Sequence, residues 1–198
     1  MRYRLCIKGA ALALLVLGTV ADAFAGPATD QLKPEIDRVI AAIEDLALQA
    51  DSRTADRRQA VRAITDRIFD WTEMSKRALG RHWEARTADE RVEFIPLFRD
   101  LLERAFLGKI EQYGTENVVY TEESPDGDDI IVRTRVTLKP SWEVGVDYRM
   151  AWQGSRWMIS DVLVERTSLV WNFRSQFDSV IKRSSFEELV KKVRARLP

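Results

Sequence analysis

Five polar side chains between positions 161 and 176 have types and a spacing that could perform chemistry. They are Asp161, Glu165, Asn172, Arg174 and Gln176. The two carboxylates end a predicted strand, and the other three follow on a predicted helix, where Asn172 and Gln176 share a face at four-residue spacing. Arg174 could reach back to either carboxylate, which predicts a structural network of hydrogen bonds at the strand-to-helix junction. The alternative is that Arg174 or Asn172 contacts a ligand or a partner surface.

The rest of the sequence offers little for catalysis. The only cysteine is Cys6 and the only histidine is His82, so neither a thiolate nor a histidine-rich metal site is expected. A G-x-S-x-G elbow and a phosphate-binding glycine loop are both missing from the sequence. The many aspartates and glutamates follow the pattern of solvated helix faces, and an acid–base pair would need an enclosed pocket to shift its pKa. We therefore predict no catalytic residues, no metal and no cofactor.

The first 25 residues have the pattern of a cleavable signal peptide. Arg2, Arg4 and Lys8 precede an apolar run over 9–20, and Ala23-Phe24-Ala25 supplies a small-x-small cleavage sequence. About a dozen apolar residues are too few to span a bilayer. Cleavage after Ala25 leaves 28 basic and 30 acidic side chains, a balance that argues against nucleic-acid binding. We predict an exported, single-domain protein of residues 26–198.

Helical spacing of apolar residues marks the first and last parts of this domain. The pattern predicts helices from near Pro34, from near Thr54 and over 72–79, with 26–31 as a loose end. Thr87 and Glu90 form a capping box before a long helix, in which Pro96 predicts a kink near 93–97. A helical stripe follows position 169, and Ser184 with Glu187 predicts the cap of a final helix.

Between these helices the period of the apolar residues changes to two. Strands are predicted over 117–123, 130–138, 142–152 and 157–165, with tight turns at Asp126-Gly127 and at Gln153-Gly154-Ser155. Strands joined in this order form an antiparallel meander. The expected fold is therefore α+β, with a twisted antiparallel sheet of about four strands covered on one face by helices.

The apolar and aromatic faces of these elements can be read in two ways. They are either a filled core or the wall of an internal cavity, and their spacing alone does not separate the two. As wall we select, by face, Phe98, Leu101, Phe106, Val136, Val144, Val146, Tyr148, Met150, Trp152 and Phe173.

Two segments resemble one protein family. The strand-to-helix junction reads D-V-x-V-E and then S-L-V-x-N-F-R-x-Q-F over 161–177, and F-D-x-x-x-M-x-x-x-x-L-G-R-H-W covers 69–83. Both are similar to motifs of the MlaC family of periplasmic phospholipid carriers, also called the toluene-tolerance family. That family usually has Gly-Val or Gly-Ile after the glutamate, where this chain has Arg166 and Thr167. The departure affects the local turn.

The resemblance implies a soluble periplasmic lipid carrier that is not an enzyme. It implies a lipid-sized cavity for acyl chains between sheet and helices, and makes a lipid headgroup a candidate contact of Arg174 or Asn172. The implied partners are an inner-membrane ABC transporter bearing an MCE-domain ring and an outer-membrane lipoprotein complex. Alternatives are a carrier of hopanoid-type lipid, a small periplasmic hydrolase or isomerase on a cone-shaped α+β fold, and an interaction module with a filled core.

Overall fold

The computed structural model describes residues 26–45, 54–113, 115–139 and 141–197, with the side chains of 54 and 106–116 outside that description. The predicted signal peptide and its cleavage site therefore lie outside the described residues. The helices are α1 (Pro27–Glu44), α2 (Thr54–Ile68), α3 (Trp71–Leu79), the 3-10 turn η3 (Gly80–His82), α4 (Ala88–Tyr113), α5 (Leu169–Arg183) and α6 (Phe186–Arg194). The strands are β1 (Thr115–Asp126), β2 (Asp129–Leu138), β3 (Trp142–Gln153), β4 (Arg156–Val164) and β5 (Thr167–Ser168). The α+β fold class is confirmed.

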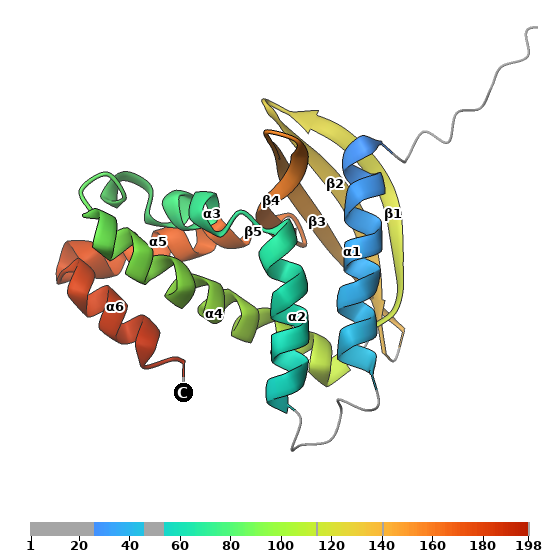
Figure 1. Ribbon diagram of the computed structural model, residues 1–198, viewed down its shortest axis with the longest axis horizontal. Coiled ribbons are helices and arrows are strands. Elements are labelled where there is room, and N and C mark those ends of the chain that lie inside the picture. Colours follow the sequence, from blue (N-terminus) through green and yellow to red (C-terminus); the bar gives the residue numbers. More distant parts are fainter. Residues whose placement is uncertain (1–25, 46–53, 114, 140, 198) are drawn as a thin grey trace, which may run out of the picture.

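The strands form one antiparallel sheet in the order β1-β2-β3-β4-β5 (Figure 1). The sheet has one strand more than predicted, because β5 is only two residues long and too short to show a period. The two predicted tight turns are present, with Gly127 and Gly154 at positive φ, a conformation that favours glycine. Residues 165 and 166 also have positive φ and form the turn between β4 and β5. This turn replaces the glycine-containing sequence typical of the resembled family.

Helix α1 lies across one face of the sheet, with α2 beside it (Figure 1). It begins at Pro27, so the predicted loose end at 26–31 is wrong and Pro34 lies inside the helix. The reason is a long-range cap, since the carboxylate of Glu123 on β1 accepts bonds from the backbone N–H and the hydroxyl of Thr29, at 2.7 and 2.6 Å. A Cβ on Gly26 would stand 2.2 Å from this carboxylate, so a larger residue there would displace the Glu123 side chain from its capping position. Local sequence carries no sign of a cap contributed by a strand 94 residues away.

A second contact ties α1 to β4. The side-chain amide of Gln31 donates to the carbonyl of Trp157 at 2.6 Å and accepts from its N–H at 2.9 Å. Close by, the N–H of Asp70 donates to the carbonyl of Ile159 at 2.9 Å. These bonds satisfy backbone groups at the edge of β4 beyond its short pairing with β5. Helix α1 is thus attached to both β1 and β4.

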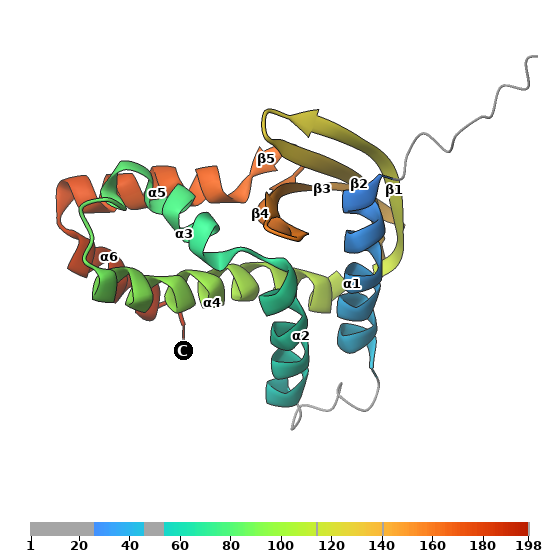
Figure 2. The same cartoon turned by 45° about the horizontal axis from the view of Figure 1, so that its top comes forward.

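Helices α3 to α6 form a second group that extends away from the sheet. Both views show α4 running from this group past α2 towards α1 (Figures 1 and 2). The predicted capping box is confirmed by bonds between Thr87 and Glu90 of 2.7 and 3.2 Å. Pro96 does not interrupt the helix, since α4 is continuous over 26 residues with Pro96 inside it. The final helix is capped by Ser185, bonded to the N–H of Glu188, one residue later than predicted.

The described residues form two apolar cores, and Phe69 and Leu169 contact both of them. One lies among α3, α4, α5 and α6 and contains the aromatic side chains Phe94, Phe98, Phe177 and Phe186. The other lies between α1, α2 and the sheet. Because the helical core is assembled without the sheet, the sheet's own apolar face has to be covered by α1 and α2.

Candidate functional site

The sheet face towards α1, here called the inner face, is divided into two halves along the strands. In the first, called the sealed half, Val132, Met150 and Ile159 have no exposed surface and Tyr148 is 8% exposed. They pack against Leu32 and Ile36 of α1 and Ile68 of α2. This half is filled protein interior.

The second half of the inner face is only half-buried. Val118, Val136 and Val144 lie opposite one another on β1, β2 and β3, and Val146 is the next inward residue on β3. We call these four valines the open strip. Helix α4 leads directly into β1 at this end of the sheet, where Trp142 is 59% exposed at the start of β3. The open strip is therefore an apolar surface that the described side chains cover incompletely.

The ten predicted wall residues fall into different places. Val136, Val144 and Val146 form part of the open strip, while Tyr148 and Met150 belong to the sealed half. The side chain of Phe106 lies outside the described residues. The other four lie elsewhere in the molecule.

Three of the predicted wall residues lie on helices and belong to the core among α3, α4, α5 and α6. Phe98, Leu101 and Phe173 pack in the helical core, where the rings of Phe98 and Phe173 meet edge to face with centroids 5.5 Å apart. Trp152 is 54% exposed at the far end of β3 and contacts the ring of Trp157. Helical spacing predicts that a residue is buried, but it does not specify which of two cores receives it.

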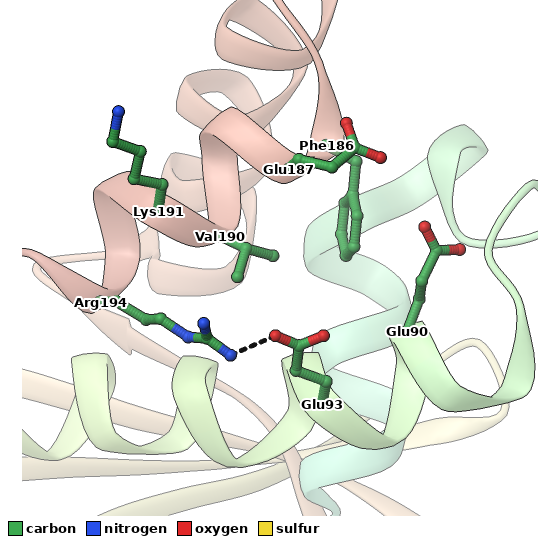
Figure 3. Close-up of a pocket in the computed structure, with 7 residues that line it drawn as sticks. All are labelled: Glu90, Glu93, Phe186, Glu187, Val190, Lys191 and Arg194. Atoms are coloured by element: carbon green, nitrogen blue, oxygen red, sulfur yellow. Dashed lines mark hydrogen bonds and ion pairs between the residues drawn. The ribbon is translucent and has the colours of Figure 1, made fainter.

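The lipid-sized cavity expected between sheet and helices is replaced, over the sealed half, by packed side chains. Two hollows lie elsewhere on the described surface. One, of about 580 Å³, lies at the start of α5 beside the exposed Trp171 and is lined by Arg166, Thr167, Ser168, Trp171, Asn172, Ser175 and Gln176. The other, of about 330 Å³, lies between α4 and α6, where Arg194 and Glu93 form an ion pair across it (Figure 3).

The residues of the predicted polar network lie in four separate places. Asn172 and Gln176 are hydrogen-bonded at 2.6 Å, as their spacing predicts. Arg174 does not reach back to the carboxylates but lies over the ring of Trp171 and against Gly80, where a Cβ would stand 2.6 Å from its Nε atom. Glu165 accepts a bond from the N–H of Gly145 at 2.6 Å. The glycine at position 80 leaves room for the guanidinium group, a contact that the spacing within one helix could not reveal.

Asp161 has a structural position at the start of α5. It is 6% exposed and accepts bonds from the hydroxyl of Ser168 at 2.5 Å and the N–H of Val170 at 3.2 Å. Burial raises the pKa of Asp161, and the bond from Ser168 partly offsets that rise. The hydroxyl of Ser168 in turn accepts from the N–H of Trp171 at 2.9 Å. These contacts cap α5 and do not face the open strip.

Two inner-face residues of β1, Val118 and Tyr120, were not among those selected from the sequence. Both lie on β1, where the alternation with the exposed Val119 would have identified them as inward-facing. Across the described ranges, no three acidic, histidine or cysteine side chains are grouped so as to hold a metal ion. Within those ranges, too, no helix combines the length and apolar character needed to cross a membrane.

Comparison with known proteins identifies the class of this fold. The chain matches the family described as MlaC protein over residues 33–195. It is also similar to a solved structure of a phospholipid-binding protein from Ralstonia solanacearum in complex with a phospholipid. The two are 25% identical with a TM-score of 0.76, and the match covers 86% of this chain and 97% of that one. The chain therefore belongs to the MlaC family, as the two sequence motifs indicated.

Proposed function

We propose that this chain is a periplasmic lipid carrier that holds the acyl chains of a phospholipid against the open strip. The observation that carries the proposal is a row of half-buried valines on the inner face of a sheet whose fold matches a phospholipid-bound protein. Each acyl methylene withdrawn from water contributes about 0.8 kcal/mol, so even one chain laid over such a surface gains several kcal/mol. In turn the lipid would cover valines that the described protein leaves partly exposed.

The same physical argument limits what the carrier does alone. A bilayer offers acyl chains an apolar medium as favourable as the protein does, so binding by itself gives no direction to transport. We therefore infer that direction comes from partners, an inner-membrane ABC transporter with an MCE-domain ring and an outer-membrane lipoprotein complex. Membership of the MlaC family supports both assignments.

The positions of three carboxylates favour a carrier over a hydrolase or isomerase. Asp147 alternates with the inward residues Val146 and Tyr148 and so faces the other side of the sheet. Asp161 is engaged in the cap of α5, and Glu165 is exposed and bonded to Gly145. An acid–base pair would have to lie beside the bound ligand, and none of these three side chains faces the open strip.

Replacing open-strip valines by a charged residue tests the proposal. We expect the chain from Gly26 onward to be purified with phospholipid, identified by extraction and mass spectrometry, and the lipid to be lost in Val136→Glu and Val144→Glu. Val119→Glu is the matched control, because Val119 is 47% exposed and lies on the opposite face of the same sheet. Circular dichroism and urea unfolding establish that each variant is folded.

Three results would count against the proposal. A lipid-free wild-type protein that takes up no phospholipid from vesicles would refute lipid carriage. An unchanged lipid load in folded Val136→Glu and Val144→Glu would remove the open strip from the site. Recovery of a polycyclic lipid in place of phospholipid would favour the hopanoid alternative.

A further inference from the structure

The hydroxyl of Tyr120 is a buried polar group without a partner among the described residues. Its oxygen is buried and makes no hydrogen bond, while its ring packs against the sealed half of the inner face. Leaving such a donor unsatisfied costs about 1–3 kcal/mol, so a native protein seldom retains one without a reason.

The position of Tyr120 relates it to the open strip. On β1, Tyr120 lies opposite Thr134 and is the inward residue next to Val118, so it stands at the boundary between the sealed half and the open strip. The hydroxyl of Thr134 is already used, since it donates to the carbonyl of Val146 at 2.5 Å. A donor at this boundary would meet the polar end of an apolar chain that lies along the valines.

The chemistry of the phenol selects the kind of group that would satisfy it. Burial raises the pKa of Tyr120 above its usual range, so the hydroxyl keeps its proton and acts as a donor. Lys33 of α1 lies 6.0 Å from the centre of the ring, and Asp37 one turn later also raises the pKa of Tyr120. A neutral or anionic oxygen acceptor would therefore satisfy the hydroxyl.

We propose that the Tyr120 hydroxyl donates a hydrogen bond to an acyl carbonyl of the lipid whose hydrocarbon covers the open strip. The inference rests on the proposed function and adds to it a preference for lipids that carry an acyl carbonyl. The carbonyl of an ester-linked acyl chain is a strong acceptor, whereas an ether-linked lipid of the same length offers only a weaker ether oxygen and a polycyclic hydrocarbon offers none. One hydrogen bond of this kind corresponds to a preference of about 3- to 10-fold.

The experiment compares three probes on delipidated protein: a diester phosphatidylcholine, its diether analogue with the same chains, and a free fatty acid. We expect wild-type protein to bind the diester about 3- to 10-fold more tightly than the diether, and Tyr120→Phe to bind both equally. Fatty acid binding that weakens in Tyr120→Phe also supports the inference and extends it to carboxyl carbonyls. Tyr148→Phe is the control, because it removes the same atom from the tyrosine in the sealed half and should leave the preference intact.

The stability of the lipid-free protein is an independent test. Tyr120→Phe should weaken the preference for the diester lipid, yet it should not lower the stability of the protein without lipid. If the hydroxyl has no partner in the empty protein, delipidated Tyr120→Phe unfolds at the same or a higher urea concentration than wild type. A lower midpoint would mean that protein or water already satisfies the hydroxyl, and would overturn the inference.

The two proposals can fail separately. Equal binding of diester and diether by wild-type protein, or a preference that persists in Tyr120→Phe, would overturn the role of Tyr120 and leave lipid carriage in place. Absence of binding to all three probes would overturn the proposed function itself.

Discussion

The two halves of the inner face are made by the same strands and by the same kinds of residue, yet one is filled and the other is not. Met150 in the sealed half has no exposed surface, whereas Val144, six residues earlier on the same strand and facing the same way, is half-buried. The alternation of apolar residues therefore determines the face of the sheet but not its burial. Burial follows from α1, which Glu123 and Gln31 attach near one end of the sheet.

Truncation of one residue in each half should give the largest contrast. Met150→Ala removes a fully enclosed side chain, and we expect a loss of about 2–5 kcal/mol in the free energy of unfolding. Val144→Ala removes half-buried methyl groups at the open strip, and we expect about 1 kcal/mol or less in the lipid-free protein. Urea unfolding of both variants measures the two values, and similar losses would mean that the open strip is packed as tightly as the sealed half.

The attachment of α1 should produce the next largest effect. Glu123→Ala removes the acceptor at the start of the helix, and we expect a loss of about 1–2 kcal/mol. Faster amide hydrogen exchange in α1 should accompany the loss, because this cap helps to hold the helix over the sealed half.

The neighbouring residue provides a matched control for that change. Glu122 is exposed and forms a surface ion pair with Arg133 at 2.8 Å, so Glu122→Ala should cost less than about 1 kcal/mol and leave exchange in α1 unchanged. Equal effects of the two substitutions would show that α1 does not depend on the Glu123 cap.

The same contrast explains how far the sequence can predict this protein. The long strands, their meander order and the cap at Thr87 depend on residues that are close in sequence, and those predictions are confirmed. The start of α1 depends on Glu123, which is distant in the chain, and that prediction is wrong. The site follows the same rule, since the period of two placed Val136, Val144 and Val146 on the inner face without telling which inward residues a helix would seal.

Residues on helices were harder to place than residues on strands. The helical spacing of Phe98 and Phe173 predicts burial on one side of each helix, and both side chains are indeed packed among aromatic rings. The partner is another helix rather than the sheet, because α3, α4, α5 and α6 make a core of their own. Arg174 shows the same limit, since its neighbours Gly80 and Trp171 come from two different elements.

The third and smallest expected effect on stability is a pH dependence that comes from Asp161 on the outer face of the sheet. Asp161 lies opposite Arg149 on β4 and β3, and burial raises the pKa of Asp161 above its ordinary value of 3.8. The folded protein therefore holds this proton more tightly than the unfolded chain does. Between 3.8 and the raised value unfolding releases a proton, so the contribution of Asp161 to stability falls as the pH rises through that window.

Comparison with Asp161→Asn isolates this contribution, because asparagine keeps the shape of the side chain and does not titrate. We expect the wild-type protein to lose stability relative to the variant as the pH rises above 3.8, and the difference to become constant above the raised pKa. Urea unfolding at closely spaced pH values measures it. Two curves that stay parallel across this range would mean that Asp161 titrates alike in the folded and unfolded chain. In that case the outer face of β4 would not exclude water from the Asp161 carboxylate strongly enough to shift its pKa. The inner and outer faces of β4 would then differ only in packing.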